Sequence, residues 1–419
     1  MKNKILFLNP PLSAKELYKN LEGAGSELPP TGIAILAAIT RNCGYQTKIL
    51  DALALKLSIN QTVEEILKIN PTYLGITSTT ISIYNAAEVA KNIKEKNKNI
   101  IIILGGPHLT AVPEETMQRF PEFDVGVIGE AEETILELLD HLDRNMPMDF
   151  VRGLIIKDGG YLKLTERRPF INDLDTLPFP AWDLLPDLLK YYQPAADSLH
   201  RSPATLLISS RGCPGQCIFC DRSVFGNKVR GYSADYVIRM IKHLQENYQI
   251  KDLFIEDDNF LVLKDRLKEI CRRIIENKID ITFSVMGRVN MIDEEMLAAL
   301  KKAGCWQINY GLESGSQKIL SLLNKNILLS QSLKALELTR KAGIKSKGLF
   351  IMGNFGETRD TIKETLKFIK KSPMDDFHIT CFTPLPGAAS WNTAAKYGYF
   401  DPDWKKVSMF AADNFVPLG

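Results

Sequence analysis

The chain has 419 residues, which is too long for one ordinary hydrophobic core and indicates two or three domains. A hydrophobic content of 45% fits a globular protein, and a net charge of +2 gives no global field that would favour a nucleic-acid partner or an anionic membrane surface. No apolar run approaches the length of a transmembrane helix, and the N-terminal run is too short for a signal peptide. Seven cysteines, three of them clustered, favour a reducing compartment, so we expect a cytoplasmic location.

Residues 1–145 alternate short apolar runs with helical patterns. We expect strands at 5–8, 47–50, 73–76, 100–104 and 125–128, and helices at 31–42, 62–69, 84–96, 113–119 and 131–142. Continuous apolar strands separated by helices predict an α/β fold with a parallel sheet covered on both faces, here a Rossmann-like (flavodoxin-like) doubly wound sheet. Ligands of such sheets bind beyond the carboxyl ends of the strands.

The segments that follow these strands are small and polar. Glycines there let a ligand approach the backbone, and hydroxyl groups suit the polar tail of a cofactor. A domain that binds a nucleotide or a phosphate would show much the same features. The candidate ligand-binding residues are Asn9, Pro10, Pro11, Ser78, Thr79, Gly105, Gly106, His108, Gly129 and Glu130.

Residues 146–203 change in character and are expected to form a linker. Asp158-Gly159-Gly160 predicts a hairpin turn between two short strands at 154–156 and 161–164. The proline-rich and aromatic stretch 177–183 is expected to pack across a domain interface, although such a stretch could also bind another protein.

From residue 204 to about 390 the alternation resumes with longer helices. We expect strands at 205–210, 252–257, 281–286, 306–312, 346–352 and 377–382, with helices between them. Six such units predict a partial (β/α)₆ barrel of the TIM type, with its site at the carboxyl ends of the strands.

Three cysteines follow the first strand of this block with the spacing C-x₃-C-x₂-C, at Cys213, Cys217 and Cys220. A [4Fe–4S] cluster normally takes four cysteines, so three would leave one iron open to a substrate. A structural zinc site needs four ligands, and the next cysteine is Cys271. A disulfide framework belongs to small secreted chains, and core cysteines need no such spacing. The spacing favours an open iron–sulfur cluster over zinc or structural thiols.

Charged side chains follow the later strands. Acidic residues at a strand end need cations, hydrogen-bond donors, water or a metal, and alternation alone does not say whether Asp257 or Asp258 faces inward. The guanidinium of Arg288 suits a carboxylate, or an ion pair with the nearby acids. Glu313 suits the vicinal hydroxyls of a ribose.

The cysteine spacing, with an aromatic residue before the last cysteine, resembles the radical S-adenosylmethionine (SAM) enzymes. Asn-Pro-Pro at 9–11, Pro-Pro-Thr-Gly at 29–32, Gly-Gly-Pro-His at 105–108 and Gly-Glu-Ala-Glu at 129–132 resemble the cobalamin domain of the B12-dependent branch of that family. The resemblance implies a [4Fe–4S] cluster on the three cysteines, and cobalamin on the candidate residues of the first domain. It also implies that SAM contacts Phe219, Asp257, Asp258, Ser284, Arg288, Glu313 and Gly353.

One motif of many B12 proteins, D-x-H-x-x-G, is absent here, because Asp51-Ala52-Leu53 has no histidine. The resemblance therefore implies cobalamin bound without a histidine ligand to cobalt. His108 is either such a ligand or a loop histidine that orders the backbone or touches the edge of the cofactor.

The resemblance implies an enzyme that methylates an unactivated carbon of a small molecule or lipid, with an electron donor of the flavodoxin or ferredoxin type and no nucleic-acid partner. One alternative uses the same cofactors for cyclisation or rearrangement without methyl transfer. Another is a non-catalytic sensor that binds cobalamin or an iron–sulfur cluster. Residues 391–419 are rich in aromatic side chains and are expected to form a lid or a docking segment.

Overall fold

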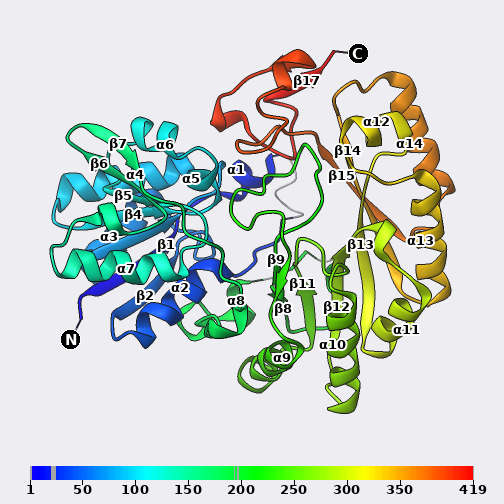
Figure 1. Cartoon of the computed structure of the whole chain (residues 1–419), viewed down its shortest axis with the longest axis horizontal. Coiled ribbons are helices and arrows are strands. Elements are labelled where there is room, and N and C mark those ends of the chain that lie inside the picture. The colour runs from blue at the N-terminus through cyan, green and yellow to red at the C-terminus, as the bar shows by residue number, and fades with distance from the viewer. Residues whose placement is uncertain (1, 20–24, 193, 196–197, 419) are drawn as a thin grey trace.

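The protein is described here from a computed structural model, which covers residues 2–19, 25–192, 194–195 and 198–418. The expected linker 146–203 includes residues 193, 196 and 197, which lie outside the described residues. Figure 1 shows two α/β domains side by side, the first in blue and cyan and the second in green to orange. The predicted fold class is confirmed: a doubly wound sheet is followed by a partial barrel.

The N-terminal sheet has the strand order β2-β1-β3-β4-β5-β6-β7. Its first five strands, all parallel, are β1 (Lys4–Asn9), β2 (Gln46–Asp51), β3 (Tyr73–Thr77), β4 (Ile101–Gly105) and β5 (Val125–Val127). The order 2-1-3-4-5 is that of flavodoxin-like folds, whose ligands bind where the winding direction reverses, next to β1 and β3.

Alternate residues of β1 enter two different cores, as expected for a strand buried on both faces. Ile5 and Phe7 pack with α2 (Thr31–Asn42) and α7 (Glu132–Asp143). Leu6 and Leu8 pack on the other face, with α3 (Ile59–Ile69) and α4 (Ile83–Lys96). Two short helices, α5 (Pro107–Ala111) and α6 (Pro113–Arg119), follow β4.

The predicted hairpin forms as β6 (Leu154–Asp158) and β7 (Tyr161–Leu164), and it pairs antiparallel with β5. The N-terminal sheet therefore continues past residue 145. The reason is burial, because the apolar residues Leu154, Ile155 and Ile156 enter the cores of that sheet.

The second sheet has the order β15-β14-β13-β12-β11-β8, with every pair parallel. Its strands are β8 (Ala204–Leu207), β11 (Asp252–Ile255), β12 (Thr282–Gly287), β13 (Cys305–Glu313), β14 (Lys345–Met352) and β15 (Asp376–Cys381). Its helices are α9 (Ala234–Tyr248), α10 (Lys264–Glu276), α11 (Glu294–Lys302), α12 (Gln317–Leu322), α13 (Leu329–Lys341) and α14 (Arg359–Lys371). Parallel pairing brings all six carboxyl ends to one rim, where a barrel site is built.

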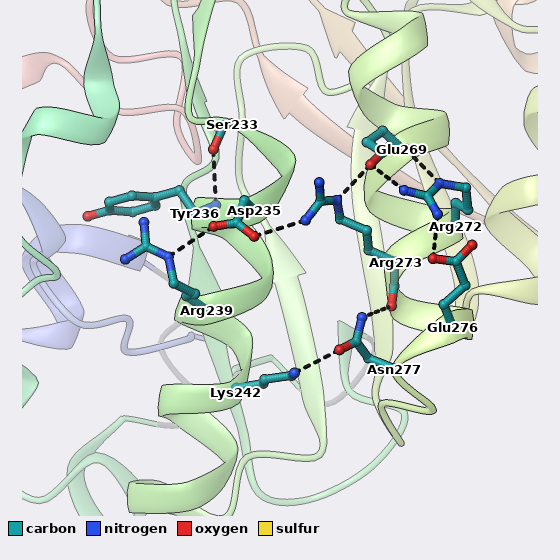
Figure 2. Close-up of polar contacts among 10 residues, drawn as sticks. All are labelled: Ser233, Asp235, Tyr236, Arg239, Lys242, Glu269, Arg272, Arg273, Glu276 and Asn277. Carbon is teal, nitrogen blue, oxygen red and sulfur yellow. Dashed lines mark hydrogen bonds and ion pairs between the residues drawn. The ribbon is translucent and has the colours of Figure 1, made fainter.

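Helices α9 and α10 carry a network of ion pairs, drawn in Figure 2. Arg273 bridges the two helices, since its guanidinium lies 2.9 Å from Asp235 and 2.6 Å from Glu269. These side chains are 34 to 61% exposed, and ion pairs open to solvent contribute between zero and about 1 kcal/mol each.

A two-stranded ribbon closes the cysteine loop at its base. Strand β9 (Ser210–Arg211) pairs antiparallel with β10 (Arg230–Gly231), so residues 212–229 form one loop that carries all three cysteines. We call residues 212–229 the cysteine loop.

The C-terminal segment, residues 391–418 and red in Figure 1, contacts both domains. The backbone nitrogen of Cys381 on β15 donates to the carbonyl of Met409 at 2.9 Å. Tyr84 on α4 donates its hydroxyl to Asp403 at 3.2 Å. The segment includes a small hairpin, β16 (Gly398–Phe400) with β17 (Phe415–Pro417). In the described part of the chain, no helix combines the length and apolarity needed to cross a membrane.

Candidate active site

The cysteine loop forms one wall of a cavity of about 490 Å³ at the rim of the barrel. Cys213, Cys217 and Cys220 all line it, so the structure brings the predicted cluster ligands to one space. Among the described residues, no three histidine, cysteine or acidic side chains converge closely enough to hold a single metal ion. Three thiols spread around a cavity suit a multi-iron cluster, because each thiolate then binds a different iron.

One of the thiols, that of Cys217, is already polarised toward its thiolate. A hydrogen bond with Cys220, together with the nearby charges of Lys325 and Arg288, lowers the pKa of the Cys217 thiol to about 6 despite its burial. The same hydrogen bond and burial raise the pKa of Cys220. A thiolate is the form that binds metal, so the positive side chains of this cavity favour loading of the loop.

The acidic pair after β11 is divided between two roles. Asp257 is 1% exposed and accepts hydrogen bonds from the backbone nitrogens and the hydroxyls of both Ser209 and Ser210, at 2.5 to 2.9 Å. It anchors the base of the cysteine loop and does not line the cavity. Asp258 does line the cavity, where burial raises its pKa, and it accepts from the backbone of Gly212 at 2.9 Å.

Arg288 and Glu313 both line the same cavity, as predicted. The guanidinium of Arg288 donates to the sulfur of Cys217 at 3.4 Å and to the backbone carbonyl of Lys325. Glu313 forms a buried ion pair with Lys325, 2.5 Å from Oε1 to Nζ, at a bulge in β13. A β-carbon at Gly311 would lie 2.6 Å from Oε1 of Glu313 and 2.8 Å from Nζ of Lys325, so a side chain there would displace this pair.

The remaining predicted SAM residues are distributed differently. Phe219 lines the cavity. Ser284 is buried on β12 with a hydroxyl that has no hydrogen-bond partner among the described residues, and it lies outside the cavity lining. Gly353 also lies outside the lining, and its backbone nitrogen donates to Glu357, just before Thr358 caps α14.

A second cavity, of about 210 Å³, opens at the carboxyl ends of the N-terminal strands. Its walls are mostly apolar and include Phe7, Ile33, Ile103 and Ile135. A β-carbon placed on Gly32 would meet no atom within 4 Å, so a side chain there would occupy the cavity itself. This glycine-edged, apolar cavity fits an inserted portion of a large cofactor such as cobalamin.

Four of the ten predicted cobalamin residues line this second cavity: Gly105, Gly106, Gly129 and Glu130. The structure does not bring the other six, Asn9, Pro10, Pro11, Ser78, Thr79 and His108, to its lining. Asn9 donates to Asp51 at 2.8 Å instead. Their contact with a cofactor outside this cavity stays a prediction.

His108 is 1% exposed and packs edge-on against Trp404 of the C-terminal segment, with ring centroids 4.4 Å apart. Its Nδ1 lies 3.0 Å from the hydroxyl of Thr80. Burial and the charge of Arg119 lower the pKa of His108 to about 3. The ring is thus held between Thr80 and the C-terminal segment, and its role toward cobalamin stays a prediction.

The two cavities share part of their walls. Pro107, at the start of α5, and Val224 and Phe225, in the cysteine loop, line both of them. The carboxyl ends of the sheet and of the barrel therefore face each other across these three side chains.

Two charged residues of the site, Lys325 and Arg211, were not predicted from the sequence. Lys325 lies in an Asn-Lys-Asn turn between α12 and α13. Turn composition could have placed it on a loop but not beside Glu313. Arg211 precedes the cysteine loop, and its buried contacts with Glu130 and Glu132 link segments about eighty residues apart. No local pattern reports such a contact.

Comparison with known proteins gives two family matches. Residues 207–369 match the radical SAM superfamily, and residues 20–139 match the B12 binding domain. A protein of Pyrococcus horikoshii, called an uncharacterized methyltransferase (PH0819), is 37% identical over 97% of this chain and 86% of its own length.

A second relative is the anaerobic magnesium-protoporphyrin IX monomethyl ester cyclase of Rubrivivax gelatinosus, which is 28% identical over 91% of this chain and 68% of its own length. Among solved structures, the cobalamin-dependent SAM radical enzyme OxsB, with aqua-cobalamin and SAM bound, superimposes with a TM-score of 0.75 at 22% identity. That match covers 89% of this chain and 53% of the OxsB chain, so this chain spans about half of OxsB, and the similarity shows a shared fold.

The two matched domains, the cavity lined by three cysteines and the apolar cavity facing it agree with one another. The chain belongs to the cobalamin-dependent radical SAM enzymes, whose cofactors are a [4Fe–4S] cluster, SAM and cobalamin.

Proposed function

We propose that the protein transfers a methyl group from cobalamin to an unactivated carbon of a small molecule or lipid. One observation carries the proposal: the cavity lined by the cysteines and the apolar cavity of the N-terminal domain share Pro107, Val224 and Phe225. Cofactors held in these two cavities would face a common space, as a substrate that reacts with both requires.

When bound, the cofactors supply one-electron cleavage of SAM and a transferable methyl group, which are reactions that side chains alone do not perform. The residues of the chain bind and orient. The thiols of Cys213, Cys217 and Cys220 would hold the cluster, and Asp258 and Arg288 carry the charges that complement an ammonium and a carboxylate. Glu313 would accept from ribose hydroxyls, and its ion pair with Lys325 would hold the carboxylate in place at the cavity wall.

The shared wall would also protect the reaction. Phe225 and Val224 are apolar, and the C-terminal segment covers neighbouring parts of both domains. Exclusion of water prevents side reactions of highly reactive species. Electrons would come from a protein donor of the flavodoxin or ferredoxin type.

The test is anaerobic incubation of the reconstituted protein with reductant, cobalamin, and SAM labelled in its methyl group, in the presence of small-molecule or lipid extracts. We expect 5′-deoxyadenosine and a product that carries the label. Failure to form 5′-deoxyadenosine under reduction would favour a non-catalytic sensor.

A second candidate is cyclisation without methyl transfer. It is favoured by the similarity to the Rubrivivax cyclase, which covers 91% of this chain. The same incubation separates the two reactions, because a cyclase would form 5′-deoxyadenosine and a product of altered mass without the labelled methyl group.

A further inference from the structure

The ribbon at the base of the cysteine loop is bound to the N-terminal domain by ion pairs. Arg211 on β9 donates to Glu130 at 2.8 Å and to Glu132 at 2.5 Å. Arg230 on β10 donates to both carboxylate oxygens of Glu130, at 2.9 and 2.8 Å. We call these four residues the ribbon clamp.

The ribbon clamp is buried, unlike the network on α9 and α10. The exposed fractions of its side chains are 5% for Arg211, 4% for Arg230, 3% for Glu130 and 9% for Glu132. Two positive and two negative charges balance. Each oxygen of Glu130 accepts two hydrogen bonds, and the fourth of these bonds comes from the backbone nitrogen of Ile171 at 2.9 Å.

Aromatic rings close the ribbon clamp on two sides. The guanidinium of Arg211 lies 5.2 Å from the ring centroid of Phe225, and that of Arg230 lies 4.7 Å from the ring centroid of Phe170. Removing one partner would leave a buried charge without compensation, so each of the four residues is needed to keep the ribbon docked.

The position of the ribbon clamp links the two cavities. Glu130, Glu132 and Arg211 line the apolar cavity, while Phe225 lines both cavities. Arg211 is separated from Cys213 by a single residue. When the ribbon is docked, the same contacts complete a wall of the apolar cavity and hold the cysteines at the rim of the barrel.

We infer that Glu130 and Arg211 are positioning residues through which binding of cobalamin and binding of the iron–sulfur cluster strengthen each other. Binding of the first cofactor orders the docked loop and loses its conformational entropy. The second cofactor then binds a loop that is already ordered, so it binds more tightly. The inference rests on the two cofactors of the family and not on the reaction proposed above, because it concerns binding alone.

The experiment measures cobalamin affinity by absorbance titration, in cluster-free and in cluster-loaded protein, for each variant. The ratio of the two dissociation constants is the coupling factor. For the unaltered protein we expect cobalamin to bind at least about fivefold more tightly when the cluster is present. For Glu130→Gln, which loses the charge that holds both arginines, we expect a ratio near one.

Two further variants keep the test decisive. Glu132→Gln removes one partner of Arg211 and leaves the pairs of Glu130 in place, so we expect an intermediate ratio, and this variant carries the test if Glu130→Gln does not fold. Asp235→Asn removes two of the ion pairs drawn in Figure 2, those with Arg239 and Arg273, and should leave the ratio unchanged.

A merely structural role would weaken both affinities and leave the ratio unchanged, and linkage allows the ratio to be measured from both sides. The factor by which the cluster tightens cobalamin binding must equal the factor by which cobalamin tightens cluster binding, measured by competition with an iron chelator. A ratio near one in the unaltered protein, or an unchanged ratio in both glutamate variants, would overturn the inference.

Discussion

The two cavities differ in the chemistry of the side chains that line them. The cavity in the N-terminal domain is bordered by glycines and aliphatic side chains. Its charged members, Glu130, Glu132 and Arg211, belong to the ribbon clamp, where Arg230 supplies the second positive charge. The cavity at the barrel rim is lined by three cysteines and by ionisable side chains that include Asp258, Arg288, Glu313 and Lys325. The difference indicates that the first cavity selects its ligand by shape and the second by charge.

The largest expected effect separates the two cavities outright. Cys217→Ala removes a predicted cluster ligand and should abolish iron binding, with a loss greater than the roughly 10- to 100-fold that changes beside a metal ligand cause. Iron analysis and visible absorbance after anaerobic reconstitution would measure it. Cobalamin should still bind at the apolar cavity, and Cys271→Ala, at a core thiol on α10, should retain the cluster.

The second prediction concerns the charged cavity alone. Lys325→Met leaves Glu313 buried without its cation, which should cost about 3–5 kcal/mol of folding stability, whereas Lys325→Arg should retain most of it. Chemical denaturation would measure both. Lys363→Met, at an exposed pair with Asp360, is the matched control, for which no measurable change is expected. Equal midpoints for Lys325→Met and the control would contradict the prediction.

The third prediction concerns the apolar cavity alone. Gly32→Leu places a side chain in the empty part of this cavity, where it would compete with the ligand for space. We expect cobalamin affinity to be reduced by about 1–3 kcal/mol, or roughly 5- to 150-fold. Gly32→Ala should have a smaller effect. Cluster binding should survive in both variants, and equal cobalamin affinity in all three proteins would show that the ligand does not enter this cavity.

The smallest effect lies outside both cavities. The folded protein holds His108 neutral, with a pKa of about 3, while the unfolded chain protonates it near its usual value of about 6.5. The contribution of this residue to the free energy of unfolding is therefore complete above about pH 6.5. It decreases as the pH falls, and the loss is about 1 kcal/mol at about pH 6. His108→Phe should remove this part of the pH dependence in thermal unfolding, and an unchanged pH profile would contradict it.

Local sequence patterns predicted the strands and helices well. Each strand is marked by an apolar run whose side chains are buried on one or both faces of its sheet. The predicted strand at 306–312, for example, corresponds to β13 at Cys305–Glu313. The cysteine spacing indicated the site, because three thiols within eight residues, Cys213 to Cys220, must lie close together whatever the rest of the chain does. Alternation left open whether Asp257 or Asp258 faces inward, and the structure shows that Asp257 is buried while Asp258 lines the cavity.

Contacts between distant segments could not be predicted. The pairing of Glu130 with Arg211 and Arg230, and of Glu313 with Lys325, depends on how whole elements pack. The hairpin of β6 and β7 was visible in the sequence, but its addition to β5 depends on which sheet edge was open. His108 was visible as a candidate ligand, and only the structure shows that Trp404 covers it.

The central claim is that the two cavities hold the two cofactors next to each other across a shared wall. Electron paramagnetic resonance tests it without knowledge of the substrate, in protein loaded with cob(II)alamin and the reduced cluster. We predict magnetic coupling between the two centres, seen as broadening or splitting of both signals, and its loss in Gly32→Leu. A spectrum that is the plain sum of the two isolated centres would contradict the account.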